Sequence, residues 1–336
     1  MTDVSFIGII PRARDLHHYS DTATSAVRWC AEAGLDGVLI FTGTGAVLDP
    51  WVVAAAVAST SPLVPLVAVN PVYQHPYTAA RMVASIGLLY ERRVDLNLIT
   101  GTAVSDLASL GDDIDHDDRY DRLAEYVKIM MALLSSPRPL SYEGRFYRVS
   151  RLQLTPALPE SLLPRLFLGG QSPAAQRVAL QTGATSIRML SPAVTASDPG
   201  ARALNFGVIT RASGDDAVRA AQALFPANPL GERVMAAGMS NTDSTWKRRL
   251  FDVAAATDGN PYGTCWLKPF RSGQADCPYL VAGYQEVADR LTAFARAGVR
   301  AFVIEAPVAE AEFRHLARAV RLTRDQLRAA AMAGQP

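Results

Sequence analysis

The sequence has little cysteine, almost no net charge and no long apolar run. Its three cysteines, Cys30, Cys265 and Cys277, are scattered without metal-ligand spacing, which excludes a disulfide framework and favours a reducing compartment. Lysine and arginine number 33 against 32 acidic residues, so the chain carries no electrostatic footprint for nucleic acid or an anionic membrane. No apolar run reaches the length of a membrane span, and the N-terminus lacks the pattern of a signal peptide. We therefore expect a cytoplasmic protein with no nucleic-acid or membrane partner.

The motifs of nicotinamide and metal sites are also missing. The segment TGTGAVLD (42–49) supplies Gly43-x-Gly45, but Leu48 stands where a dinucleotide fingerprint needs its third glycine, and the acidic residue expected further on is absent. No His-x-x-Glu, Cys-x-x-Cys or carboxylate cluster suggests a metal. A barrel hydrolase would need such a set. A redox protein with this sequence must receive electrons from elsewhere.

Short apolar runs alternate with helical patterns along the whole chain, and such continuously apolar runs are typical of parallel strands covered on both faces. The expected strands are residues 4–10, 37–42, 65–70, 94–100, 165–170, 185–190, 205–210 and 301–306. Predicted helices include 20–34, 49–58, 76–90 and 117–134, and residues 140–149 predict a β-hairpin. Eight βα units without a break in composition predict one TIM (β/α)8 barrel domain over residues 1–336. A doubly wound sheet is the alternative.

The interval of about 225–278 does not fit a βα unit. It is rich in Asn, Gly, Ser and Pro and carries a basic cluster at 247–249. A segment this long is usually a functional lid or is disordered. Because it lies between the seventh and eighth strands, its ends are expected at the C-terminal face of the barrel, where active sites are built. We expect a lid-like insertion.

A glycine pair marks the junction of a strand and a helix in PRLFLGGQSPAAQ (164–176), at Gly169-Gly170-Gln171-Ser172. A tight turn alone could require these glycines, because glycine tolerates positive φ. Backbone N–H groups at a helix start also bind anions, usually a phosphate. Tyr120, in the helical segment HDDRYDRLAEY (116–126), either presents its hydroxyl to the same anion or is simply part of an amphipathic helix.

Polar residues at other strand ends offer further candidates. Asn97 opens NLITG (97–101) inside an apolar strand, and burying its amide without a partner would cost roughly 1–3 kcal/mol. A backbone carbonyl or a bound heterocycle could be that partner. His17 and His18 follow the first strand and His75 follows the third. Imidazole titrates near neutral pH, so these histidines are candidates for proton transfer, although an adjacent pair in a loop is more often merely solvated.

The ordered set of motifs resembles the bacterial luciferase-like flavin monooxygenases, most closely their alkanesulfonate monooxygenase branch. The likeness runs over nearly the whole chain and is carried by GLDGVLIFTG, DPW, LVAVNPVYQHP, LNLITG, HDDRYDRLAEY, YEGRFYRV, PRLFLGGQS and GVRAFVIEAP. The resemblance implies a TIM barrel that uses reduced FMN and O2, with the FMN reduced by a separate NAD(P)H:flavin reductase. It also implies a homodimer or homotetramer.

The resemblance assigns roles to particular residues. Gly169, Gly170, Gln171 and Ser172 would form the phosphate loop for FMN, and Tyr120 would be a second phosphate contact. His116 starts a helix beside that site, and from this position we expect it to bind the flavin. Thr42, Asn97, Thr100 and Gly101 would lie toward the flavin ring. Arg271 would correspond to the arginine of the family's mobile lid.

The sequence departs from the alkanesulfonate enzymes at their catalytic positions. Val47 replaces their cysteine, Asn205 and Gly207 replace their Arg-x-His pattern, and the tyrosine after the last strand is lost beside Pro307. We therefore expect oxygenation of a small organic substrate other than an alkanesulfonate, at nitrogen, carbon or sulfur, with the acid–base group among His17, His18 and His75. A deazaflavin (F420)-dependent oxidoreductase of the same barrel and a non-catalytic flavin-binding relative are the alternatives.

Overall fold

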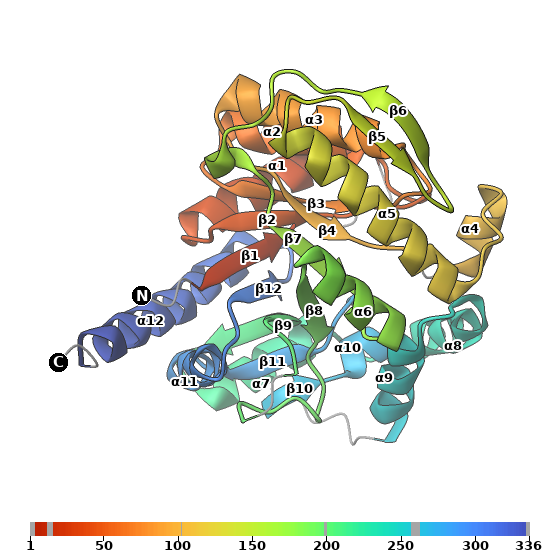
Figure 1. Ribbon diagram of the computed structural model, residues 1–336. Helices are drawn as coiled ribbons and strands as arrows, with labels where there is room; N and C mark the ends of the chain where they lie inside the picture. The colour runs from red at the N-terminus through yellow and green to blue at the C-terminus, as the bar shows by residue number, and fades with distance from the viewer. Residues whose placement is uncertain (1–3, 12–15, 102, 198–199, 257–262, 334–336) are drawn as a thin grey trace. The chain divides into compact units, whose positions relative to one another are not determined.

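The computed structural model describes residues 4–11, 16–101, 103–197, 200–256 and 263–333 (Figure 1). The chain forms two compact units. We call residues 1–11, 21–37 and 187–336 the terminal unit, and residues 12–20 and 38–186 the central unit. In the described ranges, no helix combines the length and apolar character needed to cross a membrane.

Eight strands form a closed barrel. Their order is β9-β12-β1-β2-β3-β4-β7-β8, and β8 pairs in turn with β9. The strands are β1 (Ser5–Ile9), β2 (Gly37–Ile40), β3 (Val64–Val69), β4 (Asp95–Leu98), β7 (Leu166–Gly169), β8 (Thr185–Met189), β9 (Ala203–Arg211) and β12 (Ala301–Glu305). These are the eight strands that the sequence predicts, each within a few residues. The TIM-type barrel is confirmed, and the open doubly wound sheet is excluded because the sheet closes.

Helices cover the strands of the central unit. They are α2 (Pro50–Thr60), α3 (Pro76–Tyr90), α4 (Val104–Ser109), α5 (His116–Ser135) and α6 (Pro173–Thr182), and the predicted hairpin is β5 (Leu140–Glu143) with β6 (Arg148–Leu152). Helix α5 packs against α3 and α6 (Figure 1). Helices α2, α3 and α6 each begin with proline directly after a capping residue. Proline suits that position because its ring fixes φ and the missing N–H would have no helical partner.

The cap of α2 gives a direct stability test. Asp49 Oδ1 accepts a hydrogen bond from the backbone N–H of Trp51 at 2.8 Å. We expect Asp49→Ala to lower the free energy of unfolding by about 1 kcal/mol in urea titrations, because the first turn loses its acceptor. Asp49→Asn keeps an acceptor oxygen and should stay near wild type. An equal loss in both variants would mean that the carboxylate charge, and not the hydrogen bond, stabilises the helix.

The terminal unit contains the predicted insertion between the seventh and eighth barrel strands. The elements between β9 and β12 are α7 (Gly214–Leu224), α8 (Pro229–Gly238), the 3-10 helix η2 (Met239–Asn241), α9 (Thr245–Ala256), β10 (Gly263–Trp266), α10 (Lys268–Arg271), β11 (Tyr279–Gly283) and α11 (Tyr284–Arg296). The described part of the interval is mostly helical, and its role as a lid stays a prediction. Leu250 and Ala254 of α9 pack on Leu267 and Phe270, and this apolar contact joins α9 to α10. Residues 257–262 lie outside the described ranges.

Strand β11 was not predicted. It pairs in parallel with the second half of β9, from Tyr279 opposite Gly207 to Gly283 opposite Arg211. The sequence signal is weak, because its five residues run into α11 without an intervening turn and follow directly on the proposed insertion. The final helix, α12 (Glu310–Ala333), packs against α11, and α1 (Leu16–Glu32) follows β1.

Candidate active site

The glycine pair lies where the sequence predicts, between β7 and α6 of the central unit. Gly170 has φ +153°, a conformation that residues with a side chain rarely adopt. A Cβ on Gly170 would lie 2.4 Å from the Tyr120 hydroxyl and 3.0 Å from Ala175 Cβ. Ser172 caps α6, and its Oγ accepts from the backbone N–H of Ala175 at 3.2 Å. The glycine therefore lets Tyr120 approach a helix start, which is an anion-binding position.

Tyr120 reaches this loop from α5, which packs on α6. Its side chain is buried, with 5% of its surface exposed. The ring of His116 meets that of Tyr120 nearly edge-on, with centroids 5.2 Å apart, and His116 Nδ1 lies 2.7 Å from Asp117 Oδ1. The predicted phosphate-site residues Tyr120, His116 and Gly170 are thus brought together.

Asn97 carries an unsatisfied acceptor next to the same loop. It lies in β4, opposite Phe167 of β7, and is only 8% exposed. Among the described residues, its Oδ1 has no hydrogen-bond partner. A Cβ on Gly169 would lie 3.7 Å from that oxygen. An unpaired buried acceptor is unfavourable by about 1–3 kcal/mol, so this oxygen is suited to accept from a ligand N–H.

Other polar groups follow the ends of neighbouring strands. Thr100 is buried after β4. Gly101 has φ +82°, and a Cβ there would lie 3.2 Å from Asn70 Nδ2. Asn70 ends the β3 segment, where its Oδ1 accepts from the Val72 N–H at 3.1 Å. The sequence analysis did not single out Asn70, although a polar residue ending the apolar run LVAVN was a usable signal. Thr42 is half-buried after β2.

The three histidines proposed for proton transfer occupy different settings. His75 is exposed and caps α3, with Nδ1 accepting from the Tyr77 N–H at 3.2 Å. Its ring lies edge-on to Tyr147, with centroids 5.8 Å apart. His18 is exposed on α1, and the side chain of His17 lies outside the described part of the structure. The cap gives His75 a structural role, and the catalytic role of all three remains a prediction.

Arg271 belongs to the terminal unit and ends α10. Its Nη2 lies 3.6 Å from Glu232 Oε2 of α8, and both side chains are about one-third exposed (36% and 32%). The proposed lid arginine is thus paired with a carboxylate of a neighbouring helix. Its role toward a ligand stays a prediction.

The sequence analysis missed a half-buried carboxyl group that two buried side chains hold. Glu305, the last residue of β12, accepts hydrogen bonds from Tyr279 and Cys277 in the terminal unit. Its signal was a single glutamate closing the apolar run AFVIE. Across the described residues, no three His, Cys, Asp or Glu side chains gather as metal ligands would.

The chain is similar to known proteins. Residues 12–197 match the model of a family described as luciferase-like monooxygenase. BtrO of Niallia circulans, a monooxygenase of a 4-(gamma-L-glutamylamino)butanoyl group on the acyl-carrier protein BtrI, is 31% identical over 333 residues, covering 94% of this chain and 96% of BtrO.

Two solved structures have the same fold. EDTA monooxygenase EmoA from Chelativorans sp. BNC1 has a TM-score of 0.70 and 17% identity, covering 96% of this chain and 94% of its own. The oxygenating constituent of 3,6-diketocamphane monooxygenase from Pseudomonas putida, in complex with FMN, has a TM-score of 0.65 and 16% identity, covering 94% of this chain and 96% of its own. With the family match and the relative of 31% identity, these findings identify the chain as a member of the luciferase-like monooxygenase family.

Proposed function

We propose that this chain is a two-component monooxygenase that uses reduced FMN delivered by a separate NAD(P)H:flavin reductase. The observation that carries the proposal is the buried, unpartnered Oδ1 of Asn97 beside Gly169, next to the cradle of Gly170 and Tyr120. A flavin ring offers N–H donors for such an oxygen, and its phosphate suits a helix start. The missing dinucleotide fingerprint supports a separate reductase.

The residues of the central unit have distinct tasks in this proposal. The start of α6, with Gln171 and Ser172, holds the phosphate together with the Tyr120 hydroxyl and His116. The Asn97 amide accepts from the ring, while Thr42, Thr100 and Gly101 line it. Reduced FMN supplies the two electrons that reduce O2, so that one oxygen atom enters the substrate and the other leaves as water. The protein orients the substrate and excludes bulk water.

The substrate class follows from the relative of 31% identity. BtrO acts on an acyl group carried by a protein, and we extend this to the present chain as a proposal: an acyl-carrier-linked substrate, with the carrier as partner. An alkanesulfonate is not proposed, because Val47, Asn205 and Gly207 stand at the catalytic positions of those enzymes.

Cofactor titration separates this function from its alternatives. We expect anaerobic titration to show tight binding of reduced FMN and weaker binding of reduced F420. With reduced FMN, O2 and a carrier-linked 4-(gamma-L-glutamylamino)butanoyl substrate, oxygen consumption should be matched by oxygenated product. Preference for F420 would favour the deazaflavin oxidoreductase, and FMN binding without product from this or other carrier-linked acyl groups would favour a non-catalytic relative.

The Tyr120 hydroxyl should contribute directly to cofactor affinity. We expect Tyr120→Phe to weaken reduced-FMN binding about tenfold, equivalent to about 1.4 kcal/mol, because a hydrogen bond to a charged phosphate is lost while the ring remains. Anaerobic fluorescence titration measures the Kd. Tyr142→Phe is the matched control, since Tyr142 lies on the β5–β6 hairpin against Lys128. Equal affinities for the two variants would remove Tyr120 from the phosphate site.

A further inference from the structure

Helix α8 of the terminal unit carries exposed apolar side chains on one face. Leu230 is 65% exposed and Val234 is 62% exposed, and residues four apart are neighbours on a helix surface. Arg233 and Ala237 are exposed on the same face. No residue of α8, which lies wholly within the described ranges, is fully buried. Single apolar residues are ordinary at a protein surface, whereas an apolar stripe beside a cation is typical of a helix that meets a partner.

The opposite face of α8 attaches the helix to the rest of the terminal unit. A Cβ on Gly231 would lie 2.2 Å from the Ser272 carbonyl oxygen, so glycine is needed for this close approach. Glu232 pairs with the arginine that ends α10, with 3.6 Å between Oε2 and Nη2. Met235 lies against Gly273, where an added Cβ would be 2.9 Å from Met235 Cγ. These contacts fix which side of α8 faces outward, and they place its single acidic residue, Glu232, on the inward side.

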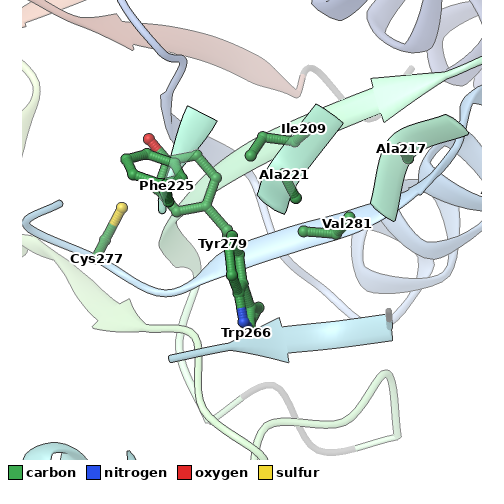
Figure 2. Packing of buried hydrophobic residues seen from close by; sticks show 8 residues of the cluster. All are labelled: Ile209, Ala217, Ala221, Phe225, Trp266, Cys277, Tyr279 and Val281. Atoms are coloured by element: carbon green, nitrogen blue, oxygen red, sulfur yellow. The ribbon is translucent and has the colours of Figure 1, made fainter. Parts of the chain in front are cut away.

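Both ends of the segment that carries α8 are held by one apolar cluster (Figure 2). Its members are Ile209, Ala217, Ala221, Phe225, Trp266, Cys277, Tyr279 and Val281. Phe225 comes four residues before α8, and Trp266 comes two residues before α10. Their rings meet nearly edge-on, with centroids 6.0 Å apart. Because the cluster brings the two ends of the segment together, α8 is held in place before a partner binds, which lowers the entropic cost of binding.

The helices of this segment concentrate positive charge. Together α8, α9 and α10 carry six basic residues against two acidic ones, whereas the whole chain has 33 against 32. The basic residues are Arg233, Lys247, Arg248, Arg249, Lys268 and Arg271. Arg233, Arg248 and Arg249 are exposed. A surface of this kind attracts an acidic partner and raises its rate of association.

The outward face of α8 therefore suits an acidic protein surface that also offers apolar contacts. A small ligand fits poorly, because small molecules bind in concave pockets, and Leu230 and Val234 project from a helix. Acyl-carrier proteins match this chemistry as a class. They are small, acidic and helical, and the arm that bears the acyl group is attached through a phosphodiester. Arginine pairs well with carboxylate and phosphate groups alike.

We propose that the outward face of α8, formed by Leu230, Arg233, Val234 and Ala237, is the docking surface for the acyl carrier. The inference rests on the proposed function, which makes a carrier-linked acyl group the substrate. Leu230 and Val234 are the apolar anchors, and Arg233 pairs with an acidic group of the carrier beside them. The surface belongs to the terminal unit alone, and binding of the carrier to it needs no flavin.

The test measures carrier binding without cofactor. The probe is BtrI carrying the 4-(gamma-L-glutamylamino)butanoyl group, fluorescently labelled and titrated by anisotropy. Arg233→Glu is expected to weaken the Kd at least tenfold at low salt, because attraction becomes repulsion, and the loss should shrink as the salt concentration rises. Val234→Ser should weaken the Kd about fivefold at every salt concentration, because it removes an apolar anchor. Circular dichroism checks that each variant is folded.

Arg321→Glu and Leu180→Ser are the matched controls. Arg321 is exposed on α12, and Leu180 is 86% exposed on α6, so each variant repeats the same kind of change on another helix. Both should keep the wild-type Kd. If Arg321→Glu weakens binding as much as Arg233→Glu, the effect comes from the net charge of the protein and the proposal fails. Equal Kd values for the wild type, Arg233→Glu and Val234→Ser would place the carrier elsewhere.

Another occupant of the face and a failure of the proposed function would give different results. If Val234→Ser keeps the carrier Kd but lowers the mass of the protein in sedimentation, the face joins two copies of this chain and the proposal is overturned. A wild-type protein that binds no carrier, yet oxygenates the acyl group as a free pantetheine thioester with reduced FMN, would overturn the docking surface and leave the monooxygenase. A protein that binds no reduced FMN, but whose carrier Kd depends on Arg233 and Val234 as expected, would overturn the monooxygenase and leave the docking surface.

Discussion

Gly170→Val is expected to weaken reduced-FMN binding by at least tenfold, about 1.4 kcal/mol. Any side chain at this position meets the Tyr120 hydroxyl, since even a Cβ would lie 2.4 Å from it. The backbone conformation, with φ +153°, adds strain that only glycine avoids. Tyr120 must then move away from the start of α6. The phosphate would lose the hydrogen bond from the Tyr120 hydroxyl, and the added side chain would take part of the space that the phosphate needs.

A comparison of single and double variants separates displacement of Tyr120 from general damage to the loop. Gly170→Ala should also weaken binding in the wild-type background. In a Tyr120→Phe background the same change should cost much less, because the clashing hydroxyl is gone and the ring carbon Cζ lies 3.4 Å from the added Cβ. Such non-additivity is the signature of two residues that act through one contact.

Gly45→Ala is the matched control, because a Cβ there meets nothing within 4 Å. Anaerobic titration measures the Kd, and circular dichroism checks that each variant is folded. An unchanged Kd for folded Gly170→Val would place the phosphate site elsewhere.

The barrel could be predicted from the sequence because each strand is signalled locally. A run such as LVAVN needs no distant partner to be identified as a buried parallel strand. The glycine pair was informative for a similar reason, since Gly169 and Gly170 lie in one short stretch between a strand and a helix. The contact of Tyr120 with Gly170 followed from neighbouring barrel units, which is a property of the fold.

The row that Glu305, Gly207 and Tyr279 form across three adjacent strands could not be predicted. It depends on the register of β9 with both β11 and β12, and residues far apart in the chain meet only through that register. The sequence showed Gly207 merely as a departure from a family pattern. The structure shows that the Tyr279 ring fills the space that a side chain at 207 would take.

Asn97 and Asp95 show how much the sequence alone can say about the roles of two polar residues in one strand. Both are polar residues in VDLNLIT, and the sequence analysis selected only Asn97. Asp95 begins β4 and is 1% exposed. Residues at the N-terminal end of barrel strands generally serve stability, whereas those at the C-terminal end serve function. The two roles differ by the position of the residue along the strand. That position is known only when the ends of the strand are known.

Asp95→Ala is accordingly expected to destabilise the protein without changing the cofactor site. The Asp95 carboxylate accepts from Arg165 Nε at 2.9 Å, from Arg165 Nη2 at 2.7 Å and from the Arg165 backbone N–H at 3.0 Å. Arg93 Nε lies 2.9 Å from the same carboxylate. Removing a buried partner typically costs 3–5 kcal/mol, because the remaining charge is left without compensation. Side-chain exposures of 40% for Arg165 and 30% for Arg93 let water compensate in part, so we expect a loss of about 3 kcal/mol.

The measurement is the free energy of unfolding in urea, followed by circular dichroism. Asp121→Ala is the matched control, since Asp121 pairs with Arg177 at 3.1 Å and both side chains are nearly half exposed. An exposed pair of this kind contributes at most about 1 kcal/mol. The reduced-FMN Kd of folded Asp95→Ala should stay within threefold of wild type, which is the reverse of the pattern expected for Gly170→Val. If Asp95→Ala were no less stable than Asp121→Ala, the carboxylate would not be acting as a buried ion pair. If it were stable but weak in FMN binding, the division of β4 into a structural end at Asp95 and a ligand-facing end at Asn97 would be wrong.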